Sequence, residues 1–232
     1  MSKIAAAGLK AVILPIVEFD CMIKSGKDHL SKLMEILGPL YQDHRPLLNY
    51  ESPFQLLVAT VLAAQCSDIA VNMATPKLFG SFPDPVSMAD APQGELETIV
   101  HSLGFFRAKA HNIKALSRQL AERHGGVVPK TMEELTALPG VGRKTASVVL
   151  SVCFGEPAII VDTHFSRVTR RLGLTHSERP EEIEKHIAAV SPREEWNKVS
   201  AVLNRFGRTV CHARKPKCEA CAVEKLCPSK SS

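Results

Sequence analysis

The chain has 232 residues, which is enough for one large domain or two small ones, and 45% of them are hydrophobic. Its net charge of +5 is a mild basic excess, consistent with a nucleic-acid partner but not specific for one. No run of about 18 uncharged apolar residues is present, so the sequence predicts no membrane span. The apolar stretch 4–17 is interrupted by Lys10 and Pro15 and lacks a clear cleavage site, so we expect a cytoplasmic protein.

Helical signals dominate the chain. Residues 52–55 (Ser-Pro-Phe-Gln) have the pattern of a capping box, and the run 56–64 that follows is almost continuously apolar. A helix that is apolar on most sides is expected in the centre of a domain. Further helices are expected, in chain order, at about 68–78, 95–103, 107–124, 131–138, 143–154, 163–172, 180–190 and 192–206. The only candidate strand is Ala158–Val161, so the predicted fold class is all-α.

The expected helices 131–138 and 143–154 are joined by a turn that contains Gly140, Val141 and Gly142. Glycine allows the backbone to turn sharply and lets a ligand approach closely. The free N–H groups at the start of the second helix can then bind an anion. The sequence is compatible with a phosphate-binding hairpin and also with a plain turn between two helices.

Lys144 follows this turn, in the first turn of a helix, where the helix dipole disfavours a cation. If partly desolvated there, its amine could attack a sugar C1′, release a base and leave an imine that permits β-elimination. Such chemistry needs a carboxylate to stabilise positive charge on the sugar, and Asp162 is the candidate. Asp162 directly precedes the expected helix 163–172, so it is also a candidate N-cap.

Four of the seven cysteines crowd into the C-terminal segment with the spacing C-x6-C-x2-C-x5-C: Cys211, Cys218, Cys221 and Cys227. Four thiolates this close in sequence can converge on one inorganic centre, either an iron–sulfur cluster or structural zinc. Zinc sites usually contain two C-x2–4-C pairs, whereas only the middle pair has that spacing here. The pattern therefore favours a cluster and leaves zinc open.

A short basic loop lies between the first two of these cysteines and contains Arg214, Lys215 and Lys217. Held between two ligands, it would form a rigid projection suited to DNA phosphates. A solvated charged loop is the alternative.

Together these features resemble the endonuclease III family of helix-hairpin-helix DNA glycosylases over about residues 30–228. The matching segments are 52–54, 64–68, 138–146, 161–164 and the four C-terminal cysteines. The resemblance implies two lobes around a DNA groove. A six-helix barrel domain would span 46–156, with its helix-hairpin-helix at about 131–154, and a cluster domain would combine 28–45 with 157–232. Residues 1–27 would then be an N-terminal extension, with Met22 as an alternative start.

The resemblance also implies roles for single residues. The four cysteines would hold a 4Fe–4S cluster in the loop 211–227, chiefly as a structural element. Lys144 matches the Schiff-base lysine and Asp162 the essential aspartate. Gln65 matches the side chain that fills the space of a flipped nucleotide, and Phe105 the inserted wedge; a helix cap and a core residue are the respective alternatives. The residues expected to contact DNA also include Gly140, Val141, Gly142, Arg143, Arg214, Lys215 and Lys217.

The expected function is a monomeric, bifunctional DNA glycosylase and AP lyase of base excision repair. It would remove oxidised pyrimidines from double-stranded DNA, also act at abasic sites, and associate with the bacterial nucleoid through DNA. One alternative is a monofunctional mismatch glycosylase, but such relatives usually lack the hairpin lysine. A non-catalytic DNA-binding module with a zinc knuckle would leave Lys144 and Asp162 without a purpose, and a redox protein would not need the hairpin.

Overall fold

The computed structural model describes residues 16–43 and 46–230, with side chains from Ser25 onward. The expected N-terminal extension lies outside the described residues from 1 to 15, and so does Met1. Within the described ranges all regular secondary structure is helical and no strand is present, which confirms the predicted fold class. No helix in these ranges has an apolar stretch long enough to cross a membrane.

The α-helices of the described chain are, in order, α1 (Ile16–Leu37), α2 (Pro53–Leu62), α3 (Asp68–Ser81), α4 (Pro85–Asp90), α5 (Gln93–Ile99), α6 (Phe106–Arg123), α7 (Met132–Thr136), α8 (Arg143–Phe154), α9 (Thr163–Arg171), α10 (Pro180–Val190) and α11 (Trp196–Thr209). Short 3-10 turns lie at Gly38–Leu40, Arg193–Glu195, Cys218–Ala220 and Glu224–Leu226. Every expected helix is present; 143–154 and 180–190 have the predicted ends, and the others have shifted ends. Helices α1 and α4 were not expected; α4 is short and is capped by Asp84.

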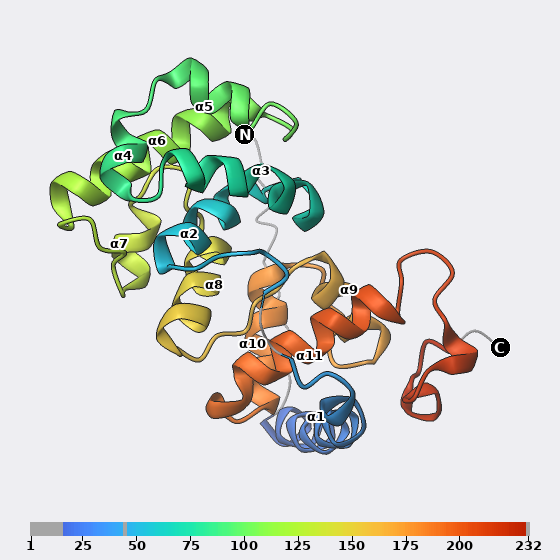
Figure 1. Ribbon diagram of the computed structural model, residues 1–232. Helices are drawn as coiled ribbons and strands as arrows, with labels where there is room; N and C mark the ends of the chain where they lie inside the picture. The colour runs from blue at the N-terminus through green and yellow to red at the C-terminus, as the bar shows by residue number, and fades with distance from the viewer. Residues whose placement is uncertain (1–15, 44–45, 231–232) are drawn as a thin grey trace, which may run out of the picture.

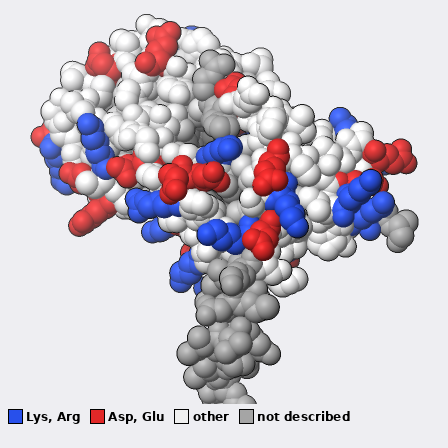
Figure 2. Space-filling model, turned by 90° about the horizontal axis from the view of Figure 1, so that it is seen from below, with Lys and Arg blue, Asp and Glu red and all other residues white. Residues whose placement is uncertain are grey.

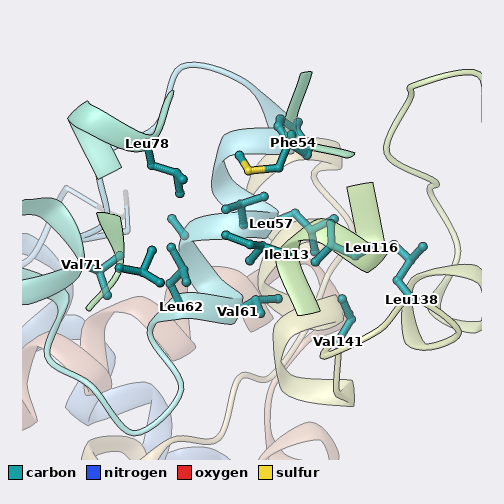
Figure 3. Close-up of a cluster of buried hydrophobic side chains, with 14 of the residues drawn as sticks. Phe54, Leu57, Val61, Leu62, Val71, Leu78, Ile113, Leu116, Leu138 and Val141 are labelled. Atoms are coloured by element: carbon teal, nitrogen blue, oxygen red, sulfur yellow. The ribbon is translucent and has the colours of Figure 1, made fainter. Parts of the chain in front are cut away.

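Helices α2 to α8 form one half of the molecule, which we call the hairpin lobe (Figure 1). Its centre is α2, where most residues are buried and which contacts α3, α6 and α8. Figure 3 shows Leu57, Val61 and Leu62 of this helix among side chains from the surrounding helices. The start of α2 is fixed by Ser52 Oγ, which accepts a hydrogen bond from Gln55 N at 3.2 Å. The apolar run thus occupies the central position predicted for it.

Helices α1, α9, α10 and α11 form the other half together with segment 210–230; we call it the cysteine lobe (Figure 1). Its core combines α1 side chains such as Leu33 with Phe165 of α9 and Phe206 of α11. Helix α1 is continuous across residues 27 and 28, where the extension was expected to end. The exact limits of the expected domains stay a prediction.

The prediction of a strand at Ala158–Val161 is wrong, because this segment has no partner strand within the described chain. Instead, its extended backbone is bound by side chains of α11. Ala158 N donates to Asn197 Oδ1 at 2.9 Å, and Ile160 N donates to Ser200 Oγ at 3.0 Å. These bonds satisfy backbone groups that a sheet would otherwise satisfy. They also fix the backbone immediately before Asp162.

Candidate active site and DNA interface

Asp162 is held in one orientation at the start of α9. Its Oδ1 accepts a hydrogen bond from Phe165 N at 2.8 Å, so it caps the helix as the sequence predicts. Its Oδ2 accepts a hydrogen bond from Asn204 Nδ2 at 2.6 Å and lies 3.8 Å from Arg208 Nη2. The side chain is only 8% exposed. A carboxylate fixed on both oxygens is pre-oriented for electrostatic work at this edge of the lobe.

His164 lies close to this carboxylate, in the first turn of α9. Burial lowers the pKa of His164 below its usual value, although the charge of Asp162 acts in the opposite direction. The guanidinium of Arg167 contributes to the lowering, and its Nη2 lies 3.3 Å from His164 Nδ1. The imidazole is therefore neutral near pH 7, and the charges beside Asp162 are those of arginine.

Lys144 is exposed in the first turn of α8. The partial desolvation suggested by the sequence is therefore absent from the free protein, because this turn projects away from the packed face of α8. Among the described residues, no hydrogen bond or ion pair joins Lys144 to Asp162. The two residues begin neighbouring helices of different lobes, and a bound substrate between them would have to bring the amine to its target.

The turn before α8 presents backbone rather than side chains. Gly140 has φ +75°, and a Cβ atom added to it would lie 2.9 Å from Asn112 Cβ, so the turn packs tightly on α6. The side chain of Val141 is buried in the core and points inward (Figure 3), so it is not available for a DNA contact. Gly142 is the N-cap of α8 and has no side chain to bond the first N–H groups. These groups are open to an anion, as expected for a phosphate-binding hairpin.

Arg143 begins α8 and reaches the other lobe. Its Nη2 lies 3.4 Å from Glu184 Oε1 of α10, and the two side chains are 66% and 37% exposed. An ion pair that exposed contributes little to stability because water screens it. Arg143 can therefore exchange Glu184 for a phosphate at low cost.

Three non-glycine residues of the described chain have a left-handed backbone: Gln65 (φ 53°), Phe105 (φ 59°) and Lys215 (φ 52°). This conformation costs a non-glycine residue roughly 1 kcal/mol or more and tends to cluster at functional sites. All three are among the residues expected to contact DNA. Gln65 is exposed, and Phe105 is 71% exposed, which argues against the core alternative for Phe105.

The basic loop is a fixed projection at the C-terminal end of the molecule (Figure 1). Lys217 N donates to Val210 O at 3.0 Å and so closes the base of the loop. Arg171 of α9 donates to the carbonyl oxygens of His212 and Ala213 at 2.7 and 3.1 Å. The three basic side chains of the loop, those of Arg214, Lys215 and Lys217, are exposed. The loop can thus offer cations to a phosphate without first becoming ordered.

One face of the molecule has a mixed surface charge (Figure 2). On the face that Figure 2 shows, Lys and Arg side chains alternate with Asp and Glu in a band across the molecule. No uniform basic surface covers the described part of that face. The candidate DNA-binding features are instead local: the hairpin, the basic loop and the exposed Gln65 and Phe105.

The four C-terminal cysteines are half-buried and free, and the segment that carries them packs on the cysteine lobe core. Arg171 Nη1 donates to Cys211 Sγ at 3.5 Å, and Cys227 Sγ donates to Arg171 O at 3.4 Å. Burial raises the pKa of Cys221 and of Cys227, and the other cysteines of the segment act in the same direction. Across the described residues, no group of His, Cys, Asp or Glu has the arrangement of a single-metal site.

Asn204 and Arg208 are site residues that the sequence did not reveal. They lie four positions apart on α11, on the same side of the helix, and Arg208 Nε donates to Asn204 Oδ1 at 2.9 Å. The available signal was two polar residues at helical spacing beside buried positions such as Leu203. That signal shows a polar stripe, but it does not identify Asp162 as the partner.

The sequence of the chain matches the HhH-GPD superfamily of base excision DNA repair proteins over residues 58–193. It is 46% identical to endonuclease III of Synechocystis sp. over 206 residues, which covers 88% of this chain and 94% of that relative. The chain belongs to the endonuclease III family. Endonuclease III of Escherichia coli is 41% identical over 203 residues, covering 86% of this chain and 96% of that protein.

The fold agrees with solved structures of the endonuclease III family. A trapped endonuclease III–DNA covalent intermediate, in an estranged-adenine complex, superposes with a TM-score of 0.84 and 40% identity. The match covers 88% of this chain and 96% of that chain. Members of the endonuclease III family are DNA glycosylases and AP lyases of the HhH-GPD superfamily. The family and the all-α glycosylase fold expected from the sequence are thereby confirmed.

Proposed function

We propose that this protein removes oxidised pyrimidines from duplex DNA and then cleaves the strand on the 3′ side of the abasic site. The reaction class is that of the endonuclease III family. The observation that carries the assignment to residues is the buried, doubly held Asp162 at the start of α9, with Lys144 at the start of the hairpin helix. A monofunctional glycosylase or a binding module would not need that lysine.

The nucleophile in this proposal is Lys144 Nζ. Its lone pair forms a bond to C1′ while the glycosidic C1′–N bond breaks, and the base leaves with the bonding electrons and takes up a proton. Opening of the sugar ring gives an imine with the lysine, which acidifies the C2′ proton. Loss of that proton expels the 3′ phosphate by β-elimination. Because Lys144 is exposed in the free protein, the bound DNA would supply the desolvation that the step requires.

Asp162 acts electrostatically in this scheme. Positive charge develops on the sugar as the base leaves, and a fixed carboxylate beside the ring stabilises it. Asn204 and Arg208 hold Oδ2, and the cap bond holds Oδ1, so little reorganisation is needed when charge appears. A fixed carboxylate lowers the barrier because its orientation is set before the reaction begins.

Base flipping is required because C1′ chemistry cannot proceed inside a stacked duplex. We assign Gln65 to the space that the flipped nucleotide leaves and Phe105 to the wedge between bases. Their exposed side chains and left-handed backbones support these roles. The hairpin would hold phosphate through the N–H groups of α8, with Arg143 and the basic loop as additional cations. We infer a monomer that acts in the bacterial cytoplasm.

The donor set at the C-terminus fits a 4Fe–4S cluster. It consists of four thiols from one segment, Cys211, Cys218, Cys221 and Cys227, all free and half-buried. When bound, the cluster would serve as a structural crosslink of this segment rather than as a participant in base release. The chain's own contribution is the attached basic loop, which Arg171 fixes against α9. Purified protein should then be brown, with an absorption band at about 400 nm; a colourless protein with stoichiometric zinc would contradict the cluster.

Borohydride trapping tests the function. Reduction of the imine on a duplex with an oxidised pyrimidine should give a covalent protein–DNA adduct. Lys144→Ala should abolish the adduct, whereas the matched control Lys185→Ala, an exposed lysine of α10, should leave it intact. An adduct of undiminished yield in Lys144→Ala removes this residue from the mechanism. Base release by the wild type without any adduct would indicate a monofunctional enzyme, and binding without base release would indicate a DNA-binding module.

A further inference from the structure

The side chain of Arg208 contacts carboxylates of both lobes. It extends from α11 of the cysteine lobe, and its Nη1 lies 2.8 Å from Asp68 Oδ2 of the hairpin lobe. Its Nη2 lies 3.8 Å from Asp162 Oδ2, and its Nε donates to Asn204 Oδ1 at 2.9 Å. The planar guanidinium can serve all three directions at once because its five N–H donors are fixed in one plane.

Asp68 lies close in the chain to Gln65, the residue assigned to the space that the flipped nucleotide leaves. It is the first residue of α3, directly after the N-cap Ser67, whose Oγ accepts a hydrogen bond from Ala70 N at 3.2 Å. Gln65, with its left-handed backbone, lies three residues earlier in the short connection from α2. A displacement of Asp68 relative to the other lobe must therefore displace the Gln65 segment as well.

The contacts of Arg208 with Asp68 and Asp162, which we call the Arg208 bridge, are partly shielded from water. The side chains of Arg208 and Asp68 are 32% and 21% exposed, and that of Asp162 is 8% exposed. Charge pairs at such exposure are screened less than surface pairs. A second ion pair between the lobes, Arg143–Glu184, is longer at 3.4 Å and far more exposed. The Arg208 bridge is thus the contact that links the lobe junction to the catalytic carboxylate.

We propose that Arg208 is a positioning residue that couples the placement of the Gln65 segment to the orientation of Asp162. While Asp68 holds Nη1, the guanidinium is pinned, and Nη2 and Asn204 restrain Oδ2 of the aspartate. Without Asp68, the guanidinium can rotate, and Asp162 keeps Asn204 and its cap but loses a fixed cation. The enzyme thereby has its carboxylate in place when the lobes are aligned for flipping. This inference rests on the proposed function.

Asp68→Asn is the sharpest test, because it removes one charge with little change of shape and lies outside the reacting atoms. Single-turnover base release at saturating enzyme should slow about tenfold or more, as expected for a misplaced catalytic group. The Kd for an uncleavable duplex and the midpoint of thermal unfolding should change little. Borohydride trapping on a preformed abasic duplex, which bypasses base release, should remain close to wild type. Glu156→Gln, in the exposed pair with Arg193, is the matched carboxylate-to-amide control.

Two further variants separate coupling from a simple structural role. Arg208→Lys retains the positive charge but cannot span the three partners, so it should slow base release as Asp68→Asn does. In an Arg208→Gln background, Asp68→Asn should have no further effect, because the bridge is already broken.

Three outcomes would decide against the inference. The inference is overturned if Asp68→Asn releases the base at the wild-type rate at saturating enzyme. It is also overturned if Arg208→Lys releases the base at the wild-type rate. Additive losses in the double variant assign Asp68 a separate role and also overturn it. A wild-type protein that releases no base from any oxidised duplex overturns the proposed function itself, which distinguishes that failure from failure of the coupling.

Discussion

The two lobes differ in the interactions that stabilise each of them internally. The hairpin lobe surrounds one apolar helix, α2, and its polar contacts include caps at helix ends, such as those of Ser52 and Thr131. In the cysteine lobe, α9 and α11 pack very closely, and arginine side chains bind backbone oxygens between elements. Arg167, for example, donates to Gly207 O at 2.7 Å and to Cys211 O at 3.0 Å.

This difference separates two tasks. An apolar core tolerates exposed, strained residues on its connections, and Gln65 and Phe105 are carried on such connections of the hairpin lobe. A polar network fixes directions, because each hydrogen bond has a preferred geometry. Asp162 belongs to such a network in the cysteine lobe. One lobe thus supplies surfaces that can enter a duplex, and the other supplies a fixed charge.

The largest effect on stability is expected from Leu57→Ala in the hairpin lobe. Leu57 is fully buried on α2, so truncation leaves a cavity and should lower the free energy of unfolding by about 2–5 kcal/mol. Ile69→Ala on α3, where the side chain is 74% exposed, should change it by less than about 0.5 kcal/mol. Denaturant unfolding measures both, and equal losses in the two variants would contradict an α2-centred core.

An intermediate effect is expected where the cysteine lobe is most tightly packed. A Cβ atom added to Gly207 would lie 2.9 Å from Val168 Cγ2 and 3.2 Å from His164 O, so Gly207→Ala should force α9 and α11 apart. The expected loss in free energy of unfolding is about 1–3 kcal/mol. Gly80→Ala is the control, because its added Cβ meets no atom within 4 Å; it should stabilise by about 0.4–1 kcal/mol. A neutral Gly207→Ala would show that the contact of α9 with α11 is easily widened.

The smallest effect concerns pH and the half-buried His164 of the cysteine lobe. Since the folded-state pKa of His164 is lowered, the unfolded chain binds more protons as the pH falls below about 6.5. The folded state should therefore lose stability from that point downward. His164→Gln should lose less between pH 7.5 and 5.5 than the wild type, whereas His111→Gln, at an exposed site of α6, should follow the wild type. Unfolding free energies at the two pH values check this, and an unchanged acid loss in His164→Gln would contradict it.

Local features were predictable because they depend on few neighbouring residues. The caps at Ser52 and Asp162 and the turn at Gly140 each involve only a short stretch of sequence. Helix α1 was not predicted, although Leu30, Leu33 and Leu37 have the spacing of one buried face and lie in the segment 28–45 that was assigned to the cluster domain. The incorrect strand at 158–161 arose from an apolar run whose partners are polar side chains of α11.

The sequence by itself determined the family, the all-α class and the candidate residues Lys144 and Asp162, because these are written in contiguous motifs. Only the tertiary structure decided what surrounds the aspartate. Asn204 lies 42 residues away in sequence, and the Arg208–Asp68 pair spans 140 residues. Helical periodicity reports which face of a helix is buried, but the packing of one helix on another decides which polar side chains meet. The environment of Asp162 therefore depends on how α11 packs on α9 and, through Arg208 and Asp68, on how the two lobes are joined.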